Sequence, residues 1–406
     1  MIPFALVLGF AHVLSVGPGH QFDRIEDAVR AASPGDSIAV YPTPGGYQRV
    51  ALRIATAHLT LVGKGKALIK LDGAGFDYSG VGPVPRAICQ VDPGGNGTIL
   101  RNFELTGAHN GSHNGAGIRI YGARDVTVDG CDIEHNDMGV MSNGSAEPEA
   151  DGANQVIQDC HIHDNGDAAD PGYNHNLYLA GASVTIRHCE IDHSLTGHNL
   201  KSRAHFTLIQ DCYVHDSANR EFDFVEAAET EPPNSNAVIV NCVIAKATDC
   251  TGNRVVIHFG REHGVRQGGL WLIHCTVLTP FASAVVSLDG SQVHAELDDD
   301  IVVNTSQAAP ALADAAGGAN LTTVIGRNNW LSASYALTGT RIDPRSRYAG
   351  SSRADTLGIR LPTFVAQNLP DVGIPAPAYY QDGTGREREV TPSAGLGACW
   401  RPLRLG

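Results

Sequence analysis

The amino-acid sequence predicts an all-β fold, a solenoid in which the chain winds as a parallel β-helix behind a short N-terminal capping helix. Short runs rich in β-branched residues recur from residue 59 onward, for example at 126–128, 184–186 and 238–240. A turn residue and a second short run follow most of them, with no helical pattern between. A repeat of this kind can extend over all 406 residues as one unit.

A repeated cysteine supports the solenoid over a β-sandwich. Asn-Gly pairs typical of sandwich hairpins do occur, at 96–97 and 143–144, but six of the nine cysteines share the context Cys-x-Ile/Val at gaps of 23 to 33 residues. Cys-x-x-Cys pairs suited to zinc are absent, and disulfides between adjacent coils are geometrically possible. We expect instead a column of small, reduced, buried thiols at one inner corner: Cys131, Cys160, Cys189, Cys212, Cys242 and Cys275.

The N-terminal residues 1–16 are apolar but lack a basic segment, so they read either as a weak signal peptide or as a first strand. Residues 19–32 have helical spacing of apolar residues and predict a helix that covers the open end of the first coil. We therefore divide the chain into residues 1–36, a strand and capping helix; 37–335, the β-helix; and 336–406, a C-terminal cap over the last coils.

The composition narrows the possible partners. A formal charge of −14 argues against nucleic acid, and an acidic polymer would need local cations or a bound metal to be held. No apolar run is long enough to span a membrane.

Three short runs between residues 174 and 226 carry unusual polar side chains. If Leu177, Leu200 and Phe224 stack at spacings of 23 and 24 residues, their neighbours form two further columns on the opposite face. The first column is Asn176, Asn199 and Asp223, and the second is Tyr178, Lys201 and Val225. This register predicts an outer patch of amide, phenol, amine and carboxylate groups.

Two segments and one motif carry a family resemblance. Residues 15–36, with an Ala-rich helix and Pro34-Gly35-Asp36, and residues 382–398 look like the usual start and closing segment of right-handed parallel β-helix proteins. The chain resembles their pectate lyase and alginate lyase superfamily, and the Lys-Ser pair within 198–204 is similar to the lysine strand of the alginate-lyase type. The resemblance implies a lysine base, an arginine acid and sometimes calcium. The Asn-Gly-Gly-Glu-type motif and the Arg-His-Gly strand of that type are absent here.

The patch has the groups that β-elimination of a uronate requires: a charge to neutralise the carboxylate, a base for the C5 proton and an acid for the leaving oxygen. We predict Lys201 as the base, its pKa lowered by the like charge of Arg203. Arg203 binds the carboxylate or acts as the acid, with Tyr178 as an alternative acid and His198 as a further catalytic candidate. Substrate-binding candidates are Asn176, Asn199, His175, His258 and Arg261.

Glu221 and Asp223 are predicted as a calcium site. Each of these assignments has a structural alternative. In these alternatives, the asparagines form hydrogen bonds to backbone groups of the turn, the stacked histidines orient the strand at a corner of the coil, and the two carboxylates form ion pairs with Lys201 and Arg203. Glu226 falls on the inner face in this register, so it needs a buried partner or the register slips there.

Three functions follow from these observations. The first is a polysaccharide lyase acting on an acidic glycan, as a secreted or periplasmic monomer with possible calcium. The second is a glycoside hydrolase using Glu221, Asp223 and Glu226, or a uronate C5-epimerase, on the same fold. The third is a solenoid that binds glycan without turnover.

Overall fold

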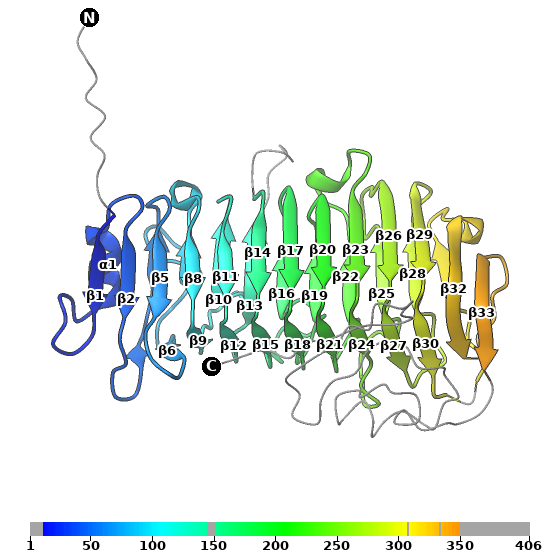
Figure 1. Ribbon diagram of the computed structural model, residues 1–406, viewed down its shortest axis with the longest axis horizontal. Helices are drawn as coiled ribbons and strands as arrows, with labels where there is room; N and C mark the ends of the chain where they lie inside the picture. The colour runs from blue at the N-terminus through cyan, green and yellow to red at the C-terminus, as the bar shows by residue number, and fades with distance from the viewer. Residues whose placement is uncertain (1–10, 144–151, 307, 333, 349–406) are drawn as a thin grey trace, which may run out of the picture.

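The computed structural model describes residues 11–143, 152–306, 308–332 and 334–348. The chain winds as a long solenoid whose coils stack side by side from the N-terminal end to β33 (Figure 1). Strands one coil apart pair in parallel along the whole stack. The predicted all-β parallel β-helix is confirmed.

One ladder of ten strands, which we call the site sheet, carries the polar patch that the sequence singled out. In coil order it contains β4 (Leu52–Ile54), β7 (Ala87–Val91), β10 (Ala116–Tyr121), β13 (Met138–Asn143), β16 (Leu177–Leu179), β19 (Leu200–Ser202), β22 (Phe222–Phe224), β25 (Ile257–Gly260), β28 (Val286–Asp289) and β31 (Ala313–Ala316).

Two further ladders complete the coils. The second ladder contains β1 (Val13–Val16), β2 (Ser37–Val40), β5 (Thr60–Gly63), β8 (Ile99–Arg101), β11 (Thr127–Asp129), β14 (Gln155–Gln158), β17 (Ser183–Arg187), β20 (Phe206–Gln210), β23 (Asn236–Val240), β26 (Gly268–Ile273) and β29 (Val293–Asp298). The third ladder contains β3 (Tyr47–Gln48), β6 (Ile69–Asp72), β9 (Phe103–Thr106), β12 (Asp132–Glu134), β15 (His161–His163), β18 (Glu190–Asp192), β21 (Tyr213–His215), β24 (Val243–Ala245), β27 (Thr276–Thr279) and β30 (Ile301–Asn304).

These two ladders join at the far end of the solenoid. The nine-residue strand β32 (Val324–Ser332) pairs with both β29 and β30, and β33 (Arg341–Tyr348) pairs with β32. Short 3₁₀ turns are η1 (Pro93–Gly95), η2 (Ala228–Thr230) and η3 (Leu321–Thr323). Apolar side chains from all three ladders fill one continuous core.

The cysteine column lies at the corner between the second and third ladders, as predicted. All six thiols are buried and free. The residue before each cysteine has a positive φ, which lets the chain turn between two strands. Cys131 N–H donates to Cys160 Sγ at 3.4 Å, and Cys212 N–H donates to Cys242 Sγ at the same distance. A small thiol therefore fits this corner on every coil.

Both ends of the solenoid differ from the predicted boundaries. The helix α1 (Ile25–Ala31) is shorter than the predicted 19–32, because Gly17 and Gly19 take positive φ in the turn that precedes it. It buries Ile25, Ala28 and Val29. Strand β1 pairs with β2, and β33 continues the ladder to residue 348, so pairing crosses the boundaries at 36 and 335.

Residues 1–10 and 349–406 lie outside the described residues. They include most of the segment 1–16, which the sequence left open between a weak signal peptide and a first strand, and most of the predicted C-terminal cap; the described end of that segment forms β1. Within the described part of the chain, no helix has the length and hydropathy of a membrane span.

A ladder of buried amides runs along the turn before the site sheet. Each side-chain amide donates to the oxygen of the next, from Asn136 to Asn165 (3.0 Å), Asn165 to Asn176 (2.9 Å), Asn176 to Asn199 (2.9 Å) and Asn199 to Glu221 (2.6 Å). They also satisfy turn backbone, as Asn199 does by donating to the His215 carbonyl. The structural alternative for the asparagines is therefore the one the contacts support.

Replacing Asn199 with alanine is expected to destabilise the fold. The change leaves the Glu221 carboxylate, the His215 carbonyl and the Ser194 N–H without this partner in a buried position. Glu221 keeps its contacts with Ser217 N–H and Lys246, so it is weakened rather than orphaned. Loss of buried hydrogen bonds of this kind costs about 1–3 kcal/mol, and we expect the free energy of unfolding to fall by that amount. Denaturant unfolding would measure it, with the exposed Gln48→Ala as control. A loss no larger than that of the control would contradict the structural role.

Candidate active site

The outer face of the site sheet carries one polar column across four strands. Tyr178 on β16 aligns with Lys201 on β19, then with Asp223 on β22 and His258 on β25. The alternate residues Leu177, Leu200, Phe222 and Ile257 are fully buried in the core. The sheet thus presents these four polar side chains from neighbouring coils, about 4.8 Å apart in backbone position.

The predicted register was wrong at β22. Leu200 aligns with Phe222 and not with Phe224, so Asp223 joins Lys201 and Tyr178 instead of the asparagines. The Phe-Asp-Phe run has a buried aromatic on both sides of Asp223, which makes two registers equally compatible with the apolar pattern. The amide ladder selects between them, because Glu221 accepts the hydrogen bond from Asn199.

Asp223 is the centre of the site. Its side chain is fully buried, and its Oδ1 accepts from Arg220 Nη1 and His258 Nδ1, both at 2.9 Å. His198 Nε2 lies 3.2 Å and Lys201 Nζ 3.5 Å from Oδ2. Burial alone would raise the pKa of Asp223, but the pairing with His198 and His258 holds it well below its usual range. Asp223 is therefore a carboxylate that orients the groups around it.

The hydrogen bonds fix which ring nitrogen of each histidine has a lone pair. His198 Nδ1 accepts from Arg220 N–H, so the neutral ring carries its hydrogen on Nε2, facing Asp223. His258 has the opposite arrangement, because its Nδ1 faces a carboxylate that only accepts. The lone pair of His258 is then on Nε2, in the orientation that an aspartate gives to a general base.

Lys201 and Arg203 share a carboxylate that the sequence did not reveal. Glu262 follows β25, and its Oε1 pairs with Lys201 Nζ while its Oε2 accepts from Arg203 Nη2 at 2.7 Å. The guanidinium carbon of Arg203 also lies 5.7 Å from the centre of the Tyr178 ring. Two carboxylates, Glu262 and Asp223, thus face Lys201. Glu262 lies between the two cations, so the predicted like-charge contact of Arg203 with Lys201 is replaced by two ion pairs, and the base role of Lys201 stays a prediction.

Comparisons with known proteins agree with this architecture. Residues 90–320 match the family model described as a right-handed β-helix region, which is more than half of the chain. The chain belongs to the right-handed β-helix family. No curated protein sequence matches it.

Among solved structures, this β-helix protein is similar to the pectate lyase Pel9A, with 13% identity, 97% of each chain covered and a TM-score of 0.51. It is also similar to a pectin methylesterase from carrot, with 14% identity over 87% of this chain and 92% of that one, at a TM-score of 0.44. At these identities the likeness concerns the fold.

Several of the predicted site residues are buried inside the β-helix and do not reach its outer face. Asn176, Asn199 and Glu221 are fully buried in the amide ladder, where Glu221 also pairs with Lys246 at 3.5 Å. Backbone groups and the next amide use their polar atoms, so these contacts favour the structural alternative over the predicted substrate and metal roles. His175 is buried as well, its ring stacked on that of His198 at 5.0 Å, and its Nδ1 accepts from His198 N–H.

The edge of the site contains one residue that follows β22, Glu226, and one that follows β25, Arg261. Glu226 has the partner that a largely buried glutamate requires, since its carboxylate accepts from the backbone N–H groups of Glu262, His263 and Gly264. These bonds fix the segment that presents Glu262 to the cations. Arg261 pairs instead with Asp289 at 2.7 Å, one coil further along.

Acid is expected to destabilise the buried histidine pair. Burial lowers the pKa of His175 well below its usual range and lowers that of His198. In the unfolded chain both titrate near about 6.5, so below that pH the unfolded state binds more protons and is favoured. Histidines whose pKa is raised, such as His163, add stability as the pH falls from about 6.5 to about 5.5, because the unfolded state still takes up protons there; below about pH 5.5 they are protonated in both states and contribute no slope.

We therefore expect the melting temperature to fall between about pH 5.5 and about pH 4.5, and to fall less in His175→Gln, which keeps an acceptor but does not titrate. Scanning calorimetry across that range measures both proteins. Equal slopes would show that His175 does not carry the effect.

Proposed function

We propose that this protein cleaves an acidic, uronate-containing polysaccharide by β-elimination. One observation carries the proposal: Lys201 and Arg203 together hold a carboxylate, that of Glu262, beside the His258–Asp223 pair. An ammonium and a guanidinium that bind a side-chain carboxylate are suited to bind the carboxylate of a uronate in its place. Binding in this way would neutralise the charge that otherwise keeps the C5 proton too weakly acidic.

In the reaction we propose, Arg203 and Lys201 hold the substrate carboxylate after Glu262 gives way. His258 Nε2 takes the C5 proton, the C5–H electrons form a C4–C5 double bond and the C4–O4 bond breaks. Lys201 donates a proton to the leaving oxygen, so one proton leaves the substrate and one returns to it.

The position of these two groups supports the assignment, because His258 and Lys201 lie against different oxygens of the same Asp223 carboxylate. Tyr178 lies against Arg203 and orients it. His198, whose two nitrogens are both engaged, orients Asp223.

The three carboxylates predicted for a hydrolase do not suit that reaction. Hydrolysis of a glycosidic bond uses an acid and a second carboxylate on opposite sides of the bond. Glu221 is fully buried, Glu226 is occupied by three backbone N–H groups, and Asp223 is surrounded by Arg220, Lys201 and two histidines. None of the three is placed as a free acid or nucleophile.

Calcium does not fit the predicted pair. Glu221 pairs with Lys246 and Asn199, whereas Asp223 pairs with a separate set of cations, so the two carboxylates do not converge. Elimination in the proposed form relies on Arg203 and Lys201 for charge neutralisation. We expect turnover to continue unchanged in EGTA, measured as initial rate against a calcium-supplemented control. A loss in EGTA that calcium restores would contradict this.

The test of the function is a panel of uronate polymers, including pectate, alginate and glycosaminoglycans. We expect ultraviolet absorbance from unsaturated ends with at least one polymer, and none with the neutral polymers of a control panel. Binding without absorbance on any uronate would favour the glycan-binding solenoid. Consistent with a polymeric substrate, we propose that the protein acts as a monomer in a secreted or periplasmic location.

A further inference from the structure

The outer face of the third ladder carries a band of alternating imidazoles and carboxylates that the proposed reaction does not use. Three rows of side chains cross neighbouring coils, and in each row imidazoles and carboxylates alternate from one coil to the next. The rows are Asp132, His161 and Glu190; Glu134, His163, Asp192 and His215; and His135, Asp164, His193 and Asp216. The third row occupies the turn after the strands, where all four residues have positive φ.

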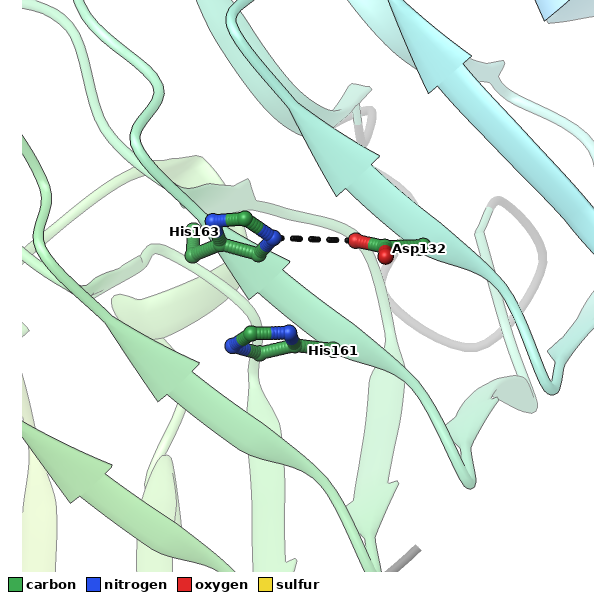
Figure 2. Close-up of side chains that lie close together, drawn as sticks. All are labelled: Asp132, His161 and His163. Carbon is green, nitrogen blue, oxygen red and sulfur yellow. Dashed lines mark hydrogen bonds and ion pairs between the residues drawn. The ribbon is translucent and has the colours of Figure 1, made fainter. Parts of the chain in front are cut away.

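We propose that Asp132, His161 and His163 form a site for a divalent transition-metal ion of the zinc type. Each residue offers one ligand atom, and these atoms lie within 4.8 Å of one another. His163 Nε2 lies 3.0 Å from Asp132 Oδ1, and the rings of His161 and His163 stack at 3.9 Å. Figure 2 shows the two rings one above the other, with one nitrogen of each on the side of Asp132.

The donor atoms lie close enough for a metal ion to draw them together by side-chain rotation. Zinc binds imidazole nitrogen and carboxylate oxygen at about 2.0–2.2 Å, so donors around it lie a little over 3 Å apart. His161 and His163 come from the same strand two residues apart and so share a face, while Asp132 comes from β12, the neighbouring strand. A metal here would connect two adjacent coils.

Each imidazole already has a carboxylate on its other nitrogen. His163 Nδ1 lies 2.7 Å from Asp164 Oδ2, and His161 Nε2 lies 2.7 Å from Asp192 Oδ1. Metal-binding histidines are generally held this way, since the second carboxylate fixes the tautomer and ring orientation and strengthens the ligand. The arrangement leaves His163 Nε2 and His161 Nδ1 as ligand atoms, with Asp164 and Asp192 as their supports.

The donor set decides the class of metal. Two imidazole nitrogens and one carboxylate oxygen suit zinc, cobalt, nickel or copper, whereas calcium and magnesium prefer oxygen ligands alone. The three side chains are only partly exposed, at 25%, 15% and 25% for His161, His163 and Asp132. The site is therefore open enough for an ion to enter and for water to complete its coordination.

The site is separate from the proposed catalytic residues, which lie on the site sheet. Its expected effect is stabilisation of coils rather than turnover, because a ligand that binds only the folded state raises its stability. The inference therefore stands or fails independently of the proposed function.

The experiment is a titration of the full-length, metal-free protein with Zn²⁺ by calorimetry, and with Co²⁺ by visible absorption. We expect one strong zinc site, a higher melting temperature with zinc, and cobalt bands that report nitrogen and oxygen ligands. In the variant His161→Gln with His163→Gln, we expect zinc affinity to fall by at least about 100-fold and the thermal shift to disappear.

His135→Gln is the matched control, since this exposed histidine lies in the same band but outside the ligand set. Its zinc affinity should equal that of the parent. An unchanged circular dichroism spectrum of the double variant shows that folding is intact. Failure of the parent to bind zinc, or equal affinity in the double variant and the parent, would overturn the proposal.

Discussion

Replacing His258 with glutamine is expected to reduce kcat for uronate cleavage by about 10²–10⁴-fold, the usual contribution of a general base. Glutamine can keep a hydrogen bond to Asp223 but has no lone pair that accepts the C5 proton. The KM should change little, because Lys201 and Arg203 still bind the carboxylate. Initial rates of ultraviolet absorbance measure both constants.

His263→Gln is the control for this experiment, since His263 is exposed in the same segment and contributes only a backbone N–H to Glu226. It should keep the parent rate. Parent-like turnover in His258→Gln would remove His258 from the base role and return that role to Lys201.

Replacing Lys201 with arginine is expected to lower kcat by at least about 10²-fold while KM stays near the parent value. Arginine keeps the positive charge between Asp223 and Glu262, so it still binds a carboxylate. It does not give up a proton in proteins, so it cannot protonate the leaving oxygen. Lys201→Met, which also loses the charge, should in addition raise KM.

The comparison of the two substitutions separates proton transfer from binding. Near-parent kcat in Lys201→Arg would mean that Lys201 acts only through its charge. If, in addition, KM rises in Lys201→Met but not in Lys201→Arg, the role of Lys201 is substrate binding.

The fold could be predicted from the sequence because a solenoid repeats its local chemistry. The same corner accepts a cysteine on six coils, each after a residue with positive φ, and this regularity is visible as a spacing in the chain. The columns of buried apolar residues could be predicted for the same reason, since structurally equivalent positions recur once per coil.

The site was only partly predictable, for two physical reasons. The Phe222-Asp223-Phe224 run fits the core in two registers, and buried polar contacts such as the bond from Asn199 to Glu221 select one. Glu262 comes from a turn with no repeating pattern and is 61 residues from Lys201. Its position depends on Glu226, whose contacts with that turn no spacing in the sequence reveals.

The asparagines illustrate the limit of reading polar residues beside a strand as binding groups. Asn176 and Asn199 look like donors for a substrate carboxylate, yet a turn repeated on each coil leaves backbone carbonyls that need a buried donor. A periodic amide in a solenoid therefore indicates a structural ladder first, whereas the non-periodic Lys201, Arg203 and His258 mark the place where coils differ.

The most direct test of the central claim is the mass of the product formed in ¹⁸O-labelled water. Elimination breaks the C4–O4 bond without adding water. In samples quenched before the new reducing end exchanges its anomeric oxygen with the solvent, the two product chains together should therefore have the mass of the substrate chain and contain no ¹⁸O. The new non-reducing end should carry the double bond, and both products should form at least about 10²-fold more slowly with His258→Gln. Incorporation of ¹⁸O at the cleaved linkage or at a released ester acid would contradict elimination and assign the protein to the hydrolases.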